Sequence, residues 1–126
     1  MKPSQSSIYR DLELLMQWYL PIGNKMPKEQ ALQNLGNSFQ QELIEAMRMC
    51  RLALKSSDNK KSQCEFIDLI VFHLEGCHAV FGLLHEYKLD KGPIISHTQF
   101  ANYLERTASL NRQIGGWRKK AASQTS

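Results

Sequence analysis

The chain has 126 residues, of which 42% are hydrophobic, and a formal net charge of +4. This length suits one domain and is too short for two of ordinary size. No run approaches the roughly 18 apolar residues of a membrane-spanning helix, and the polar segment 1–7 precedes no hydrophobic stretch. We therefore expect a soluble, cytoplasmic protein with no membrane partner and no export signal.

Positive charge is concentrated near the C-terminus. Residues 1–105 carry 11 cations against 12 acids, whereas residues 106–126 carry five cations and no carboxylate. An excess of cations confined to one segment is typical of proteins that bind a polyanion.

The first predicted helix covers residues 7–20. Ile8, Leu12, Leu15 and Tyr19 recur at helical spacing on one face, and Pro21 is expected to end the helix. Residues 21–27 are predicted to form a turn, with Pro27 at the first position of the next helix.

The second predicted helix covers residues 27–56. Its apolar seam has steps of three and four residues: Leu32, Gly36, Phe39, Leu43, Ala46, Cys50 and Leu54. Arg48, Arg51 and Lys55 lie together on the opposite face, and the basic run continues into Lys60 and Lys61.

The third predicted helix covers residues 60–89, with a start near Asp58 or at a Ser62–Glu65 capping box and a break at 91–93. Its apolar residues spread over most of the circumference, and only Asp68, Glu75 and Glu86 form a polar wedge. One small bundle buries about one stripe of each helix. We therefore expect this helix to contact another subunit as well.

The fourth predicted helix covers residues 96–119, opens with a Ser96–Gln99 capping box, and precedes a polar tail at 121–126. Trp117 falls on its apolar side if the helix continues through Gly115 and Gly116. Short loops between four such helices predict an all-α, up-down-up-down four-helix bundle.

Catalytic and metal sites require particular residue types at particular spacings. Glu75-x-x-His78 has the spacing of half a di-iron site, but a bundle of that kind needs a second copy and two more inward glutamates. Glycine-rich phosphate loops do not occur, and no nucleophile–His–acid pattern stands out. Cys50, Cys64 and Cys77 form no C-x-x-C pair and read as small buried side chains in a reducing compartment. We expect no enzymatic activity, no metal and no cofactor.

Basic residues are the remaining candidates for a site. The predicted nucleic-acid-binding residues are Arg48, Arg51, Lys55, Arg112, Arg118, Lys119 and Lys120. Trp117 is interpreted as an anchor in the core or at a subunit interface, with stacking on a base as the alternative. Leu83 is predicted to face outward at the interface.

Two segments resemble a known family. The turn with Tyr19, Pro21, Ile22, Pro27 and Lys28, and the closing Gly116-Trp117-Arg118-Lys119, resemble the accessory variability determinant (Avd) proteins of diversity-generating retroelements. The resemblance covers roughly residues 8–120. The same fold occurs in proteins encoded within intervening sequences of ribosomal RNA, and the motifs do not separate the two groups.

The resemblance implies a four-helix protomer assembled as a homopentamer with a positive surface. It implies binding to a reverse transcriptase and to template-repeat RNA, in support of mutagenic retrohoming. The net charge of −1 before residue 106 is low for such a protein, so RNA binding could depend mostly on the polymerase. The alternative is a helix-bundle protein linked to ribosomal RNA intervening sequences with an unknown binding role.

Overall fold

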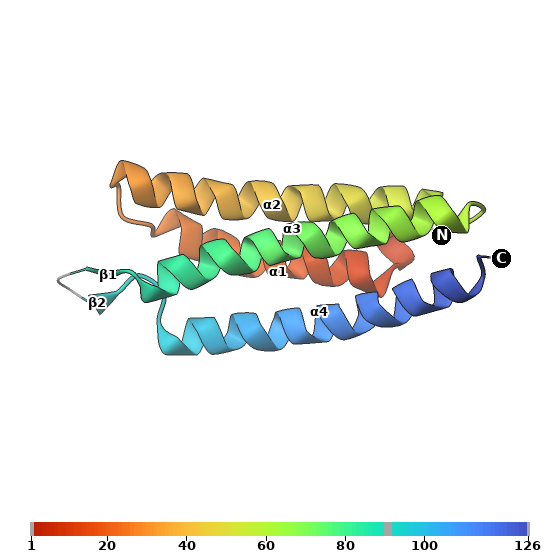
Figure 1. Ribbon diagram of the computed structural model, residues 1–126. Coiled ribbons are helices and arrows are strands. Elements are labelled where there is room, and N and C mark those ends of the chain that lie inside the picture. Colours follow the sequence, from red (N-terminus) through yellow and green to blue (C-terminus); the bar gives the residue numbers. More distant parts are fainter. Residues whose placement is uncertain (1, 90–91, 126) are drawn as a thin grey trace.

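The computed structural model describes residues 2–89 and 92–125 and has four long helices (Figure 1). They are α1 (Ser7–Asn24), α2 (Gln30–Lys55), α3 (Lys60–Glu86) and α4 (His97–Ser123), with a short 3-10 turn η1 (Pro3–Gln5) and two short strands, β1 (Lys88–Leu89) and β2 (Gly92–Pro93). Successive helices run in opposite directions, and α4 also packs against α1. The predicted all-α four-helix bundle is therefore confirmed.

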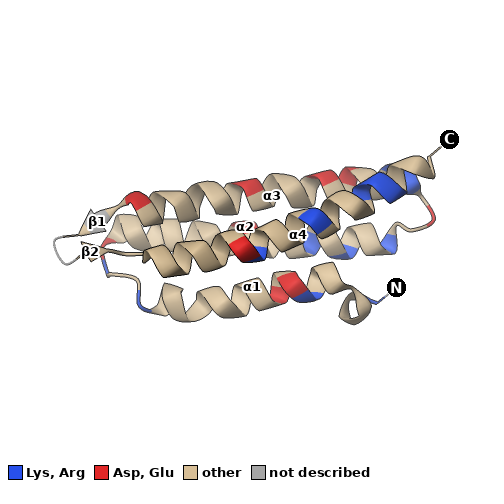
Figure 2. Ribbon diagram, turned by 90° about the horizontal axis from the view of Figure 1, so that it is seen from below, with Lys and Arg blue, Asp and Glu red and all other residues tan. Residues whose placement is uncertain are grey.

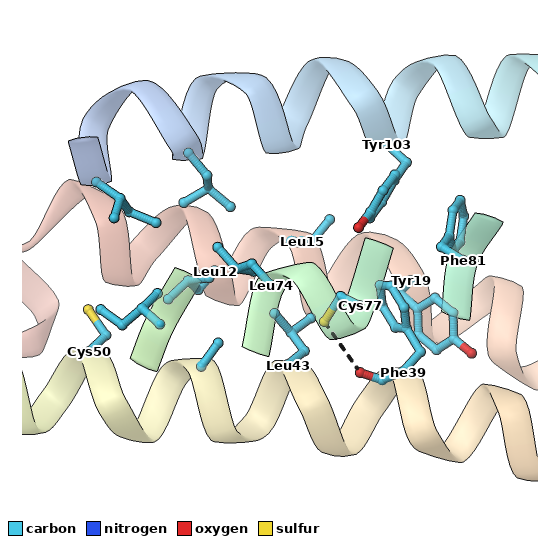
Figure 3. Close-up of a cluster of buried hydrophobic side chains, with 14 of the residues drawn as sticks. Leu12, Leu15, Tyr19, Phe39, Leu43, Cys50, Leu74, Cys77, Phe81 and Tyr103 are labelled. Carbon is cyan, nitrogen blue, oxygen red and sulfur yellow. Dashed lines mark hydrogen bonds between the residues drawn. The ribbon is translucent and has the colours of Figure 1, made fainter. Parts of the chain in front are cut away.

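The core contains one large aromatic side chain from each helix (Figure 3). Tyr19, Phe39, Phe81 and Tyr103 are fully buried. Ring centroids are 4.2 Å apart for Tyr19–Phe39, 5.4 Å for Phe39–Phe81 and 4.4 Å for Phe81–Tyr103. Tilted and offset contacts of this kind add to the free energy of burial, so the cluster ties all four helices together at one level.

The predicted end of the first helix at Pro21 is wrong. Helix α1 continues to Asn24 with Pro21 inside its last turns. Proline removes one backbone hydrogen bond, that to the carbonyl of Gln17, which lies on an exposed part of the helix. The Tyr19 hydroxyl donates to the Gly36 carbonyl oxygen at 3.1 Å and holds this end of α1 against α2. The turn is correspondingly later, and α2 begins at Gln30 rather than at Pro27.

The third helix starts at Lys60, the first residue of the predicted range 60–89, but its cap is not the predicted Ser62. Asn59 is its N-cap, and the Asn59 side chain accepts a hydrogen bond from the Ser62 amide at 3.1 Å. The Ser62–Glu65 capping box is therefore wrong, because an Asx cap three residues earlier already satisfies that amide. At its other end α3 stops at Glu86 rather than at residue 89, and Leu89 pairs with Gly92 in a short antiparallel ladder. Lys91 of the predicted break lies outside the described residues.

Helix α4 begins as predicted. Ser96 accepts from the Gln99 amide at 3.0 Å, and the Gln99 side chain accepts from the Ser96 amide at 2.9 Å. The helix passes through both glycines and ends at Ser123, four residues beyond the predicted end. Ala121 is buried and extends the apolar seam. Half of the predicted polar tail, residues 121–123, is thus helical, and Ser126 lies outside the described residues.

Helix α3 is apolar on two faces. One face enters the core, while Leu69, Phe72 and Leu83 are 41%, 63% and 54% exposed on the other. Their spacing places them, together with the exposed Ala79, on one side of the helix, which we call the outward stripe. By length and composition α3 could cross a membrane, although only 33% of its most apolar window is buried inside the bundle. One such helix is weak evidence for a membrane span, and the single chain leaves the outward stripe uncovered.

Candidate nucleic-acid interface

One end of the bundle gathers the predicted basic residues. Because the helices alternate in direction, the last turns of α2 and α4 lie beside the first turns of α1 and α3, and both chain ends lie there too (Figure 2). We call this region the basic end; its cations are Lys2, Arg10, Arg48, Arg51, Lys55, Lys60, Lys61, Arg112, Arg118, Lys119 and Lys120. Two sets that are about 60 residues apart in the sequence therefore lie at the same end of the bundle, on two helices that are diagonal to each other.

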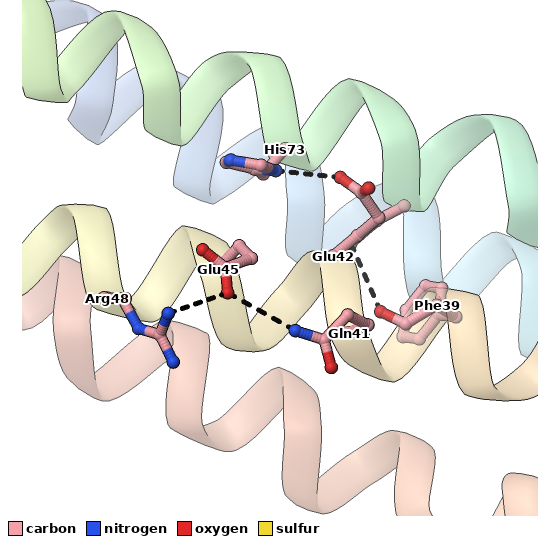
Figure 4. A network of polar contacts seen from close by, with 7 residues as sticks. Phe39, Gln41, Glu42, Glu45, Arg48 and His73 are labelled. Atoms are coloured by element: carbon pink, nitrogen blue, oxygen red, sulfur yellow. Dashed lines mark hydrogen bonds and ion pairs between the residues drawn. The ribbon is translucent and has the colours of Figure 1, made fainter.

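The α2 set is largely exposed. Arg48 forms an ion pair with Glu45 at 3.1 Å one helical turn earlier (Figure 4), whereas Arg51 and Lys55 have no carboxylate partner among the described residues. All three line a groove of about 360 Å³ beside Tyr9 on α1. The rest of the groove lining is largely apolar and consists of Tyr9, Ile44, Met47 and Leu52.

One cation of the α4 set forms an ion pair with an acidic residue, and the others do not among the described residues. Arg118 donates from Nε to Asp68 Oδ1 at 2.8 Å and from a terminal nitrogen to Asp68 Oδ2 at 3.2 Å. The hydrogen bond to Asp68 raises the pKa of Arg118 above its ordinary value. Arg112, Lys119 and Lys120 are exposed, and within the described ranges no acid pairs with them. Arg118 is thus the member of the set whose charge is already neutralised.

The Trp117 side chain contacts both the hydrophobic core and a cleft at the protein surface. It is partly buried and packs against the hydrophobic core. It also lines a cleft of about 430 Å³ between the N-terminal segment, the α2–α3 connection and the end of α4. Lys60 and Lys120 line the same cleft. These two lysines are 60 residues apart in the sequence, and the alternation of helix directions brings them to the same cleft.

Histidines and acidic residues outside the basic end lie in separate places. Glu75 and His78 line a groove between α3 and α4, and His85 Nε2 lies 3.2 Å from His97 Nδ1. No group of three or more His, Cys, Asp or Glu side chains suited to a metal ion occurs within 2–89 and 92–125. The histidine pair was not expected, because its members belong to different helices.

The three cysteines are buried and unpaired. Burial raises the pKa of Cys50 and of Cys77 to about 12, in the second case with a contribution from Glu42. A thiol that keeps its proton is a poor nucleophile and a poor metal ligand. These residues act as small core side chains.

A polar pair between α2 and α3 was also missed. His73 Nδ1 lies 2.9 Å from Glu42 Oε2 (Figure 4). Gly76, one turn beyond His73, makes room for this contact, because a Cβ atom there would come 2.5 Å from the Glu42 carboxylate. No spacing rule in the sequence signals a pair between helices of this kind.

Comparisons with known proteins complete the description of the site. Protein-family models, curated proteins and solved structures all give no match to this chain. The function must accordingly be argued from the geometry and charge of the basic end.

Proposed function

We propose that the protein is a non-enzymatic accessory protein that binds RNA at its basic end and docks a reverse transcriptase. In this role it would be the accessory variability determinant of a diversity-generating retroelement. The observation that carries RNA binding is the convergence of the α2 and α4 cations on one end of the bundle. The role in a retroelement rests on the resemblance of the turn at 19–28 and of the closing 116–119.

Phosphate contact is the mode of binding that the basic end favours. Exposed cations on rigid helices attract any nucleic acid backbone, and each neutralised phosphate releases counterions. Arg51, Lys55, Arg112, Lys119 and Lys120 are the principal contacts under this proposal. Arg48 and Arg118 contribute less, because Glu45 and Asp68 already hold them.

Assembly into a homopentamer is part of the same proposal. The outward stripe of α3 supports an oligomer, since contiguous exposed apolar residues mark interaction surfaces. The number of five rests on the resemblance. In a ring, five basic ends would act together through effective concentration, so that individually weak contacts bind RNA firmly.

The test is a titration of fluorescent single-stranded RNA followed by anisotropy at several salt concentrations. Replacing Arg112, Lys119 and Lys120 with glutamine should weaken binding to all RNAs and lower the salt slope by about 2, given roughly 0.7 per phosphate contact. Arg51→Gln with Lys55→Gln should lower it by about 1.4. The matched control is Lys25→Gln with Lys28→Gln at the opposite end, which should change neither quantity.

Unchanged affinity in both basic-end variants would remove direct RNA binding and leave only the polymerase-docking role. An adjacent reverse transcriptase gene with a pair of near-identical repeats would support the retroelement. A location inside a ribosomal RNA gene would instead support the alternative, a protein of ribosomal RNA intervening sequences.

A further inference from the structure

The cleft at the basic end has the composition of a nucleotide site. Its volume of about 430 Å³ lies within the range of pockets that hold small molecules. An indole, two lysines and several serine and glutamine side chains line it, and none of the described residues in its lining is acidic. A lining that contains cations and no carboxylates favours the binding of a phosphate group, and an indole favours stacking with a planar ring.

Lys60 is held in place at the cleft. Its Nζ donates to Gln63 Oε1 at 3.2 Å, and the buried Gln63 donates from Nε2 to the Ala53 carbonyl oxygen at 2.9 Å. The chain of two hydrogen bonds fixes the ammonium group near the mouth while leaving its other protons available. Lys120, one turn from the indole-bearing residue on α4, supplies the second cation.

Trp117 supplies the aromatic wall. One part of the side chain packs against the core and the rest meets the cleft, so the ring is held rigidly while part of it stays accessible. Stacking of an unpaired base on such a ring requires no particular base, because every base has a π-face. A base inside a duplex could not enter the cleft without leaving its stack.

We propose that this cleft binds one unpaired nucleotide of RNA, with the base against Trp117 and its phosphate between Lys60 and Lys120. The inference rests on the proposed function in taking RNA as the ligand. It adds a preference that phosphate contact alone does not give: single-stranded RNA binds more tightly than duplex RNA of equal charge.

Tryptophan fluorescence provides the direct test. The chain has two tryptophans, and Trp18→Phe leaves Trp117 as the sole tryptophan, whose emission is excited apart from that of the tyrosines, while keeping an aromatic ring beside Phe81. In this variant, adenosine monophosphate should quench the emission saturably, and a single-stranded hexa-adenylate should do so at lower concentration. Ribose 5-phosphate, which has the phosphate but no base, should leave the emission unchanged.

Variants then separate the groups in the cleft. Lys60→Gln and Lys120→Gln should each lower the affinity for adenosine monophosphate about tenfold, as expected for loss of a charged hydrogen bond. Trp117→Leu should lower the affinity for labelled hexa-adenylate about 5- to 100-fold, because the base loses its stacking partner. Trp117→Phe should retain much of the affinity, which covers the case in which the leucine variant does not fold. The control is Lys25→Gln, an exposed lysine at the opposite end of the bundle and outside the cleft lining.

The outcomes distinguish the two proposals. RNA binding without quenching, or equal affinity for single-stranded and duplex RNA, overturns the nucleotide cleft and leaves the proposed function standing. Quenching by adenosine monophosphate with no binding of longer RNA overturns the proposed function and leaves a mononucleotide site. Equal quenching by ribose 5-phosphate reduces the cleft to an anion site and overturns base stacking.

Discussion

Gly36 lies where α2 comes closest to the aromatic cluster. A Cβ atom at this position would lie 3.0 Å from the Tyr19 hydroxyl oxygen, which cannot retreat because it is buried and bonded to the Gly36 carbonyl. Alanine usually stabilises a helix relative to glycine by about 0.5–1 kcal/mol. Here overpacking should outweigh that gain, and we expect Gly36→Ala to lower the free energy of unfolding by about 1–3 kcal/mol.

Gly115 is the matched control for this prediction. It is also inside a helix, but a Cβ atom there would meet nothing within 4 Å. Gly115→Ala should therefore stabilise the protein by about 0.5–1 kcal/mol in urea denaturation. The argument is wrong if the two variants shift the free energy of unfolding in the same direction.

Two buried thiols and two buried phenols should make the fold sensitive to alkali, because burial raises the pKa of Tyr103 as well as those of Tyr19, Cys50 and Cys77. An unfolded thiol loses its proton near pH 9.0 and an unfolded tyrosine near 10.0, whereas burial raises the pKa of Cys50, Cys77 and Tyr19 to about 12. Between pH 9 and 12 the folded state thus holds more protons than the unfolded state. The free energy of unfolding should be constant around pH 8 and fall as the pH rises through this window.

The double variant Cys50→Ala, Cys77→Ala tests the assignment to the thiols. Its denaturation midpoint at pH 8 will be lower, because the two cavities cost stability. Its decline between pH 9 and 11 should nevertheless be shallower than that of the wild type. Parallel declines in the two proteins would assign the alkaline transition to other groups.

At the scale of elements, the contact between Arg118 and Asp68 joins the last turns of α4 to the first turns of α3. Both side chains are well exposed, at 38% and 59%, so the pair should add little to stability. The ion pair does, however, engage the Arg118 side chain, which is then less available to contact a phosphate at the basic end. Asp68→Asn should release Arg118 from its ion pair. The affinity for single-stranded RNA should then rise about two- to threefold at low salt, the effect of roughly one added phosphate contact.

Glu86→Gln provides the control for Asp68→Asn. It removes the same charge from the same helix at the far end of the bundle. It should leave RNA affinity unchanged, because screening confines a surface charge to about 10 Å at ordinary salt. Equal tightening in both variants would mean that net charge, and not Arg118, sets the affinity.

The elements also show how far the sequence predicts the fold. Helical periodicity located all four helices because each buries a regular seam, and the Ser96–Gln99 box was correct because both partners are local. The errors occur where a distant contact decides the helix end: Tyr19 on Gly36 extends α1, and the burial of Ala121 extends α4. Asn59 was passed over because a second plausible cap, Ser62, follows it within one turn.

At the scale of the whole molecule, the alternation of helix directions makes the charge asymmetric. The sequence indicated two basic sets, and the antiparallel packing places them on the same end, opposite the β1–β2 hairpin. The cleft beside Trp117 could not be predicted, since its lining comes from the N-terminal segment, the α2–α3 connection and α4. The ion pair of Asp68 with Arg118 was equally invisible, because charge counts carry no information on pairing between helices. The pair of Glu45 with Arg48 lies within α2, and its spacing of three residues is one that the sequence does indicate.

Assembly is the remaining prediction at this scale. The outward stripe of α3 exposes more apolar surface than the other helices do, and water penalises such a stripe unless a partner covers it. Light scattering at micromolar concentration should give a multiple of 14.5 kDa, five under the proposed pentamer. Phe72→Glu or Leu83→Lys should reduce the mass to that of one chain while the helical circular dichroism persists, because neither side chain belongs to the core. Leu20→Glu, an exposed leucine on the diagonally opposite α1, should leave the oligomer intact. A wild-type mass of 14.5 kDa would rule out the assembly, and dissociation by Leu20→Glu alone would move the interface from α3 to α1.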